Sequence, residues 1–125
     1  MITTLLACRD NTLFSNLIDT FQNQGIQIDS VSSGSLALTM MTDRSYNLLI
    51  TDEHLPDMTG IDLIKKTITL NPLINCVAVS TLSHKDFHEK TEGMGVLMQF
   101  PPKPDVKTVQ ALLDHLDKIY ALSKK

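Results

Sequence analysis

Short apolar runs alternate with helix-spaced apolar stripes along most of this chain. The short runs are compact or alternating, as in β-strands, and they lie at residues 2–8, 26–31, 47–52, 74–80 and 96–100. Most of them are apolar at nearly every position, which is typical of parallel strands covered on both faces. The pattern therefore predicts a buried parallel sheet.

Apolar residues at helical spacing follow most of the strands. They predict helices at residues 13–21, 36–41, 61–68 and 106–120. Gly25 is expected to stop the first helix, and Asn71 and Pro72 are expected to end the third. Turn and cap chemistry before the second helix comes from Ser32, Ser33 and Gly34. Residues 83–93 have only Phe87 as a strong apolar anchor, so the helix expected there has the weakest signal.

Alternating strand and helix units indicate an α/β fold. Parallel strands need crossover helices, and these crossovers are right-handed. We expect a flavodoxin-like, doubly wound sheet of five parallel strands in the order 2-1-3-4-5, with five helices. A length of 125 residues suits one domain, so we expect a single domain over residues 1–125.

Charge and composition narrow the range of functions. The net charge is −3 and the acidic and basic residues are mixed along the chain, so we expect no direct binding to nucleic acid. The chain opens without a basic leader and has no apolar stretch as long as a membrane span, so we expect a cytoplasmic protein that does not bind a membrane. Cys8 and Cys76 lie in strand-like runs, where free thiols usually behave as small buried apolar groups.

Four residues with useful chemistry follow predicted strands, namely Asp10, Asp52, Ser80 and Lys103. Ligands of open parallel sheets bind beyond the carboxyl ends of the strands, so we expect the fold to gather these side chains. Asp10 and Asp52 would repel each other, and Mg²⁺, which prefers oxygen ligands, would relieve the repulsion. A carboxylate can also attack phosphorus and form an acyl phosphate, with an ammonium and a hydroxyl group stabilising the transferring oxygens.

Three motifs resemble those of one protein family, the CheY-like receiver domains of bacterial response regulators. In ITDEHLPDMTGIDLI, the residues Asp52, Pro56 and Gly60 have the family's spacing of phosphoacceptor, loop proline and helix-opening glycine. In VAVSTLS, Ser80 falls on the family's Ser or Thr position, and in PPKP, Lys103 begins its Lys-Pro pair. The resemblance covers essentially the whole chain.

This resemblance implies a phosphorylation switch in a two-component signalling pathway. Asp52 would take a phosphoryl group from a histidine kinase or phosphotransfer protein, after which Ser80 would turn toward the phosphoryl oxygens and Lys103 would contact them. The metal Mg²⁺ would be held by Asp10, Asp52 and the backbone carbonyl of His54.

The same resemblance places an aromatic switch at Phe100. The surface expected to change comprises residues 83–93, 96–100 and 106–120, and it would control an output partner or an effector domain. The thin apolar signal of residues 83–93 suits a moving part of low local stability. Whether this surface also forms a homodimer stays open.

One residue of the expected site departs from the family pattern. Receivers usually carry two adjacent acids after the first strand, and here Arg9 replaces the first acid while Asp10 matches the second. The missing acid would reach the metal through water, so we hypothesise that Mg²⁺ affinity is ~10 to 100-fold weaker. Alternatively, the Arg9 guanidinium pairs with Asp52 and partly replaces the charge of the metal. Thr81 also departs, since the family usually has Ala or Gly there.

Simpler interpretations of these residues remain open. Asp52 could hydrogen bond within its loop, Asp10 could be the N-cap of the first helix, and Lys103 could be an ordinary solvated lysine. His84 and His88 have a spacing that can hold zinc, but no matching third ligand is evident, so we interpret them as part of a solvated face.

Two other functions compete with that of a phosphorylation switch. A pseudo-receiver would bind a partner regardless of phosphate, which the presence of Arg9 makes conceivable. An aspartyl-phosphate phosphohydrolase would need a second aspartate where His54 lies, and no Gly-rich loop for a nucleotide or a flavin follows the first strand. We therefore expect a signalling protein and not an enzyme.

Overall fold

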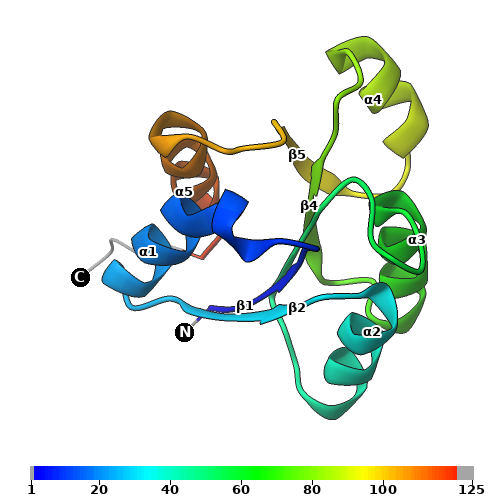
Figure 1. Cartoon of the computed structure of the whole chain (residues 1–125), viewed down its shortest axis with the longest axis horizontal. Coiled ribbons are helices and arrows are strands. Elements are labelled where there is room, and N and C mark those ends of the chain that lie inside the picture. The colour runs from blue at the N-terminus through cyan, green and yellow to red at the C-terminus, as the bar shows by residue number, and fades with distance from the viewer. Residues whose placement is uncertain (1, 121–125) are drawn as a thin grey trace.

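Five parallel strands form the centre of the structure, in the spatial order β2-β1-β3-β4-β5 (Figure 1). The structure is a computed structural model, and residues 2–120 are described. The strands are β1 (Thr3–Ala7), β2 (Gln27–Val31), β3 (Leu48–Thr51), β4 (Asn75–Val79) and β5 (Val96–Phe100). Each lies within a segment predicted from the apolar pattern. The predicted fold class and strand order are therefore confirmed.

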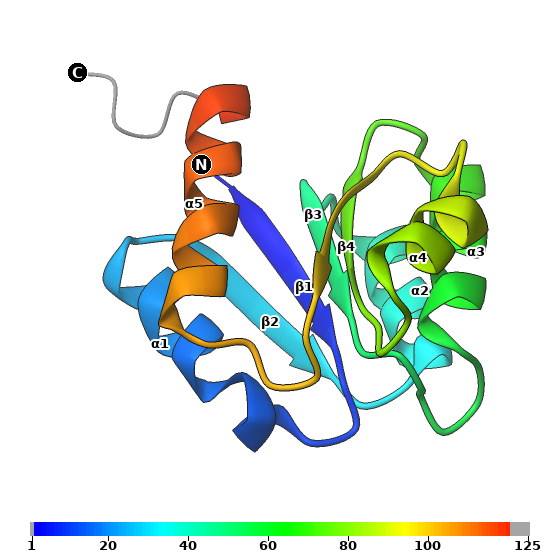
Figure 2. The same cartoon turned by 90° about the horizontal axis from the view of Figure 1, so that it is seen from above.

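Helices cover both faces of the sheet (Figure 2). One face carries α1 (Ser15–Asn23), which follows the 3₁₀ turn η1 (Asn11–Phe14), and α5 (Val106–Tyr120), whereas the other carries α2 (Gly34–Asp43), α3 (Gly60–Leu70) and α4 (His84–Thr91). Successive strand residues point to opposite faces, so Leu6 and Ile50 belong to the first core while Leu5 and Leu49 belong to the second. None of the helices in residues 2–120 is long and apolar enough to cross a membrane.

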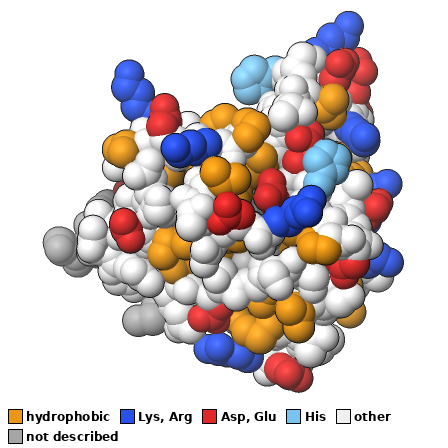
Figure 3. Space-filling view, in the orientation of Figure 1, with side chains coloured by type: hydrophobic (Ala, Val, Ile, Leu, Met, Phe, Trp, Pro, Cys, Tyr) orange, Lys and Arg blue, Asp and Glu red, His pale blue; other side chains and the backbone are white. Residues whose placement is uncertain are grey.

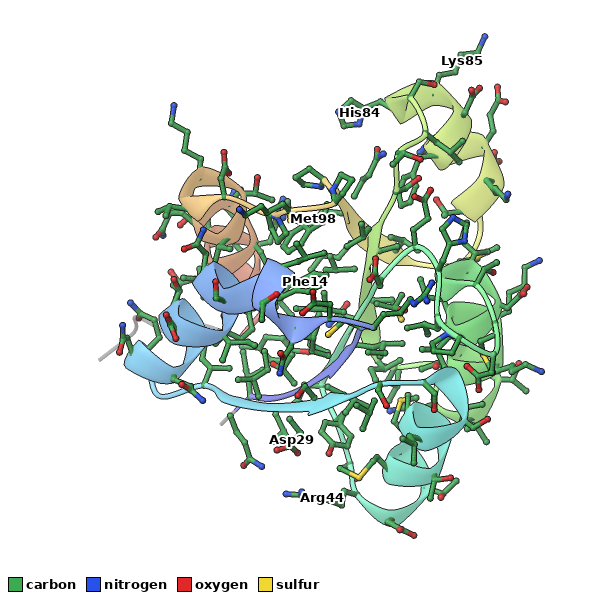
Figure 4. The ribbon with its side chains drawn as sticks, viewed as in Figure 1. Phe14, Asp29, Arg44, His84, Lys85 and Met98 are labelled. Atoms are coloured by element: carbon green, nitrogen blue, oxygen red, sulfur yellow. The ribbon has the colours of Figure 1, made fainter. Side chains whose placement is uncertain are left out.

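The weakly predicted fourth helix is formed as α4 and rests on few buried residues. Phe87 is its apolar anchor and is 6% exposed, while most of its other side chains face solvent. The Ser83 hydroxyl caps the helix by accepting a hydrogen bond from the Asp86 N–H at 3.1 Å. Figure 4 shows His84 and Lys85 projecting from the outer end of α4. The helix is thus held against the sheet mainly by one aromatic side chain.

Hydrogen bonds join the end of α5 to the amino-terminal edge of the sheet. The Tyr120 hydroxyl accepts a bond from Asn75 Nδ2 at 2.8 Å and donates a long one to the Asn47 carbonyl at 3.5 Å. The side-chain oxygen of Asn47 accepts a bond from the Thr3 N–H at 2.9 Å. These bonds connect α5 to the starts of β1, β3 and β4.

The loop between β3 and α3 is fastened to the start of α2 by Asp57. Its carboxylate accepts hydrogen bonds from the N–H groups of Gly34 and Ser35, both at 2.9 Å, and from the Ser35 hydroxyl at 2.7 Å. A negative charge at a helix N-terminus is also favoured by the helix dipole. These hydrogen bonds lower the pKa of Asp57 to about 2, with the largest contribution from the Ser35 hydroxyl and smaller ones from the two N–H groups.

Asp57→Asn should therefore lower the free energy of unfolding at neutral pH, because the amide carries no charge to attract these donors. The folded pKa of Asp57 lies below the unfolded value of 3.8, so the carboxylate stabilises the fold fully above 3.8 and loses this effect as the pH falls toward about 2. Urea unfolding of both proteins from neutral to acidic pH should show the difference shrinking over that window. A difference that stays constant would contradict this role.

Candidate functional site

The carboxyl ends of the strands meet at one edge of the sheet, which faces the viewer in Figure 1 and lies along the lower side of Figure 2. Figure 3 shows acidic, basic and histidine side chains close together over the middle of this face. The loops after β1, β3, β4 and β5 supply the residues that the sequence singled out.

Asp52 directly follows β3, the middle strand of the sheet. Its N–H donates to the Ala7 carbonyl at 2.8 Å, which continues the pairing of β3 with β1 beyond the end of the strand. The side chain is half-buried, and its Oδ1 accepts a hydrogen bond from the Glu53 N–H at 2.8 Å. None of the hydrogen bonds among the described residues uses Oδ2 of this carboxylate. That oxygen is therefore available for chemistry.

Asp10 lies beyond β1 with an exposed side chain. Its Oδ1 accepts bonds from the Thr12 hydroxyl at 2.6 Å and from the Thr12 N–H at 3.0 Å, so it caps the turn η1. Both bonds lower the pKa of Asp10, and the Thr12 hydroxyl contributes more than the Thr12 N–H. Both bonds from Thr12 use the same oxygen, so capping leaves the second oxygen to bind a cation.

Cys8 follows the last residue of β1, Ala7, whose carbonyl accepts the bond from the Asp52 N–H. Burial, followed by the negative charges of Asp52 and Asp10, raises the pKa of Cys8 to about 11. Since Asp10 follows Cys8 closely in the chain, Asp10 and Asp52 both lie at the carboxyl end of β1. Cys8 and Cys76 are both buried and unpaired, as predicted.

Arg9 is exposed and lines a cavity of about 410 Å³ together with Cys8 and Asp10. The described residues include an ion pair between Arg44 and Asp29 at 3.2 Å, but none between Arg9 and Asp52. Figure 4 shows Asp29 and Arg44 together on the side of β2 and α2. The alternative in which Arg9 pairs with Asp52 is therefore not formed in this structure.

Ser80 follows β4 and is 6% exposed. Its N–H donates to the carbonyl of Phe100 at 3.0 Å, and its hydroxyl oxygen accepts from the Leu82 N–H at 3.1 Å. Phe100 is fully buried in the core under α1 and α5. The expected hydroxyl and the expected aromatic switch are thus direct neighbours through the backbone.

Lys103 lies on the loop between β5 and α5, with an exposed side chain. Asp105 ends this loop by capping α5, accepting bonds from the Thr108 N–H and hydroxyl, both at 2.8 Å. Figure 2 shows the loop running along the same edge as the loops after β1 and β3. The topology therefore brings Lys103 to the edge that carries Asp52.

Glu53 is the functional candidate that the sequence analysis missed. Its carboxylate accepts hydrogen bonds from the Thr81 N–H and hydroxyl and from the Ser80 hydroxyl. It thereby joins the residues that follow β3 to those that follow β4. The adjacent acids at positions 52 and 53 were the signal available in the sequence, but an acid in a loop is usually solvated.

Gly60 opens α3 in close contact with the phosphoacceptor candidate. A Cβ atom at Gly60 would clash with the carbonyl oxygen of Asp52 and would lie 3.1 Å from the Thr51 side chain. The Gly60 N–H donates to the Glu53 carbonyl at 2.9 Å. Since the main obstacle is a backbone atom, only glycine allows the loop to close in this way.

The oxygen atoms at this edge suit a hard cation better than zinc. In residues 2–120 there is no group of three His, Cys, Asp or Glu side chains that could hold a metal, and His84 and His88 are exposed on α4. Asp10, Asp52 and the carbonyl of His54 would supply two charged oxygens and one neutral oxygen. Mg²⁺ usually keeps several waters and needs few protein ligands. These three oxygens therefore fit Mg²⁺, although they carry little negative charge for a divalent ion.

Residues 6–113 match the family model of the response regulator receiver domain. The chain belongs to this family. Receiver domains are signalling modules of two-component systems, and they typically bind Mg²⁺ at the phosphorylation site.

Among curated proteins, the receiver is 22% identical over 94 residues to the sporulation initiation phosphotransferase F of Bacillus subtilis, which covers 75% of this chain and 76% of that protein. It is 28% identical over 68 residues to the response regulator receiver protein CpdR of Brucella abortus, covering 54% of this chain and 57% of that protein.

Solved structures show the same fold at low sequence identity. The chemotaxis response regulator CheY4 of Vibrio cholerae has a TM-score of 0.81 at 16% identity, over 93% of this receiver and 98% of that chain. A two-component response regulator from Clostridium difficile has a TM-score of 0.82 at 16% identity, over 100% of both chains.

Gly60→Ala should lower the free energy of unfolding by ~1–3 kcal/mol, because the added methyl group must push the Asp52 carbonyl out of place. Gly34→Ala is the matched control, since Gly34 also opens a helix but a Cβ there would meet the flexible side chain of Met58. The control should lose less stability in urea unfolding. Equal losses would show that the approach of Gly60 to Asp52 is not tight.

Proposed function

We propose that this receiver is a phosphorylation switch in which Asp52 accepts a phosphoryl group from the phosphohistidine of a histidine kinase or phosphotransfer protein. The position of Asp52 carries the proposal: it is half-buried at the carboxyl end of the middle strand, with an unbonded Oδ2. Residues 1–125 would act as one receiver domain in the cytoplasm and control an output partner or an effector domain.

The phosphoryl transfer would use residues of this protein that follow four of its strands, β1, β3, β4 and β5. An Asp52 oxygen attacks phosphorus, an O–P bond forms, and the N–P bond of the phosphohistidine breaks with its electron pair leaving on the donor nitrogen. Lys103 then neutralises charge on the phosphoryl oxygens, and the Ser80 hydroxyl donates to one of them. Asp10, Asp52 and the His54 carbonyl would hold Mg²⁺, which would supply further positive charge near the phosphoryl oxygens.

The output would pass from Ser80 to the neighbouring strand. A phosphoryl group adds roughly 1.5 to 2 negative charges, which is enough to draw hydroxyl and ammonium groups toward it. Movement of Ser80 is coupled to β5 through its bond to the Phe100 carbonyl at 3.0 Å. The sparsely anchored α4 lies beside β5. The surface of α4, β5 and α5 can therefore change conformation at a low cost in free energy.

A pseudo-receiver that acts without phosphate is the second candidate function. It is favoured by Arg9, which brings a positive charge to the edge where an acid would help to bind Mg²⁺. Asp10 adds to this argument, since Thr12 already holds one of its oxygens. Such a protein would keep the interaction surface while losing the dependence on Mg²⁺.

A small phosphodonor separates the two candidates. Incubation with acetyl phosphate and Mg²⁺ should give a labile phosphate adduct in the intact mass, because the half-buried Asp52 can act as a nucleophile. Asp52→Asn should give no adduct, since an amide oxygen cannot form the acyl phosphate. No adduct on the unsubstituted protein with any donor would favour the pseudo-receiver.

The role of Arg9 can be tested by titration with Mg²⁺. Arg9→Asp should bind Mg²⁺ ~10 to 100-fold more tightly than the unsubstituted protein, because the second acid returns and a repelling charge is removed. Calorimetric titration measures both affinities, and Arg9→Asp combined with Asp52→Asn serves as a control in which the tight site should be lost. Equal affinities of Arg9→Asp and the unsubstituted protein would remove Arg9 as the cause of weak binding.

A further inference from the structure

Hydrogen-bond donors at the end of β4 are already occupied by the carboxylate of Glu53. Its Oε2 accepts from the Thr81 N–H at 3.0 Å, and the Thr81 hydroxyl lies 3.1 Å from both carboxylate oxygens. The Ser80 hydroxyl makes a longer contact of 3.4 Å with Oε2. Two hydroxyl groups and one backbone N–H thus converge on one negatively charged group.

The Glu53 carboxylate and its donors lie beside the proposed phosphoacceptor, since Glu53 directly follows Asp52 in the chain. A phosphoryl group on Asp52 would present oxygens that need the same kind of donors. The Ser80 oxygen accepts a bond from the Leu82 N–H, and its hydroxyl has one hydrogen to donate. Ser80 therefore cannot donate to Glu53 and to a phosphoryl oxygen at the same time.

A second position for the Glu53 side chain is open nearby. Glu53 lines a cavity of about 290 Å³ whose wall also includes Lys65 of α3 and Lys90 of α4, together with one other acid, Asp62. A phosphoryl group on Asp52 would repel the adjacent Glu53 carboxylate, whereas two ammonium groups against the one carboxylate of Asp62 give the cavity wall a net positive charge that would attract it. The cavity thus offers Glu53 a place of net opposite charge once it leaves the end of β4.

We propose that Glu53 is a positioning residue that competes with the phosphoryl group for the Ser80 hydroxyl and the Thr81 N–H, while the Thr81 hydroxyl holds the Glu53 carboxylate in place. In the unphosphorylated protein its carboxylate holds these donors, and on phosphorylation it releases them and turns toward Lys65 and Lys90. This inference rests on the proposed role of Asp52. Its consequence is that Glu53 opposes phosphorylation and keeps Ser80 in the inactive position until phosphate arrives.

Substitutions at Thr81 test the competition without changing the charge. Thr81→Val keeps the size of the side chain but removes the hydroxyl that holds Glu53, whereas Thr81→Ser keeps the hydroxyl. The rate of adduct formation from acetyl phosphate with Mg²⁺ is followed by intact mass on the full chain. Thr81→Val should react roughly threefold to tenfold faster than the unsubstituted protein, and Thr81→Ser should match it within about twofold. Equal rates for Thr81→Val and Thr81→Ser would overturn the proposal.

A parallel set tests Glu53 itself. Glu53→Gln should also react roughly threefold to tenfold faster, because its neutral side chain binds the donors more weakly. Glu89→Gln is the matched control, since it makes the same substitution but Glu89 is exposed on α4, does not line this cavity and does not bind Ser80 or Thr81. Its rate should stay within about twofold of the unsubstituted protein.

The outcomes distinguish this inference from the proposed function. Adducts that form on Asp52 at equal rates in Glu53→Gln, Glu89→Gln and the unsubstituted protein would overturn only the role of Glu53. Absence of any adduct, in every variant, would overturn the function of Asp52 and the inference with it. If Glu53→Gln failed to fold, the comparison of Thr81→Val with Thr81→Ser would still decide, because Thr81 is exposed.

Discussion

The parallel direction of the five strands is the constraint on which this receiver depends. It brings the loops after β1, β3, β4 and β5 to one edge, although their residues are far apart in the chain. Backbone hydrogen bonds extend this order beyond the strands, from the Asp52 N–H to the Ala7 carbonyl and from the Ser80 N–H to the Phe100 carbonyl. The backbone positions of Asp52 and Ser80 are therefore fixed by hydrogen bonds to the neighbouring strands, and the loops determine only the directions of the side chains.

Periodicity in the sequence was enough to predict the sheet, because burial on both faces demands nearly continuous apolar strands. Even α4 could be placed from Phe87 alone, which proved to be its buried anchor. The site was predicted only as a set of strand ends. Glu53 and Asp57 were missed, since each binds residues more than twenty positions away and such loop contacts leave no period in the sequence.

The edge around Asp52 contains charges of both signs that are not paired with Asp52. Glu53 beside it binds neutral donors of Ser80 and Thr81, and Asp10 binds Thr12. Arg9 and Lys103 are exposed on the loops that follow β1 and β5. Few strong ion pairs would have to be broken when the charge at Asp52 changes. A modest electrostatic change can therefore rearrange these charged side chains.

The bonds of Tyr120 have a mechanical consequence. Because they fix the last turn of α5 to the starts of β1, β3 and β4, Tyr120 lies at the edge of the sheet opposite to the one that carries Asp52. A strand of five residues spans roughly 17 Å. A rigid-body displacement of α5 would therefore carry a change made at the edge of Asp52 over the whole length of the strands to the opposite edge.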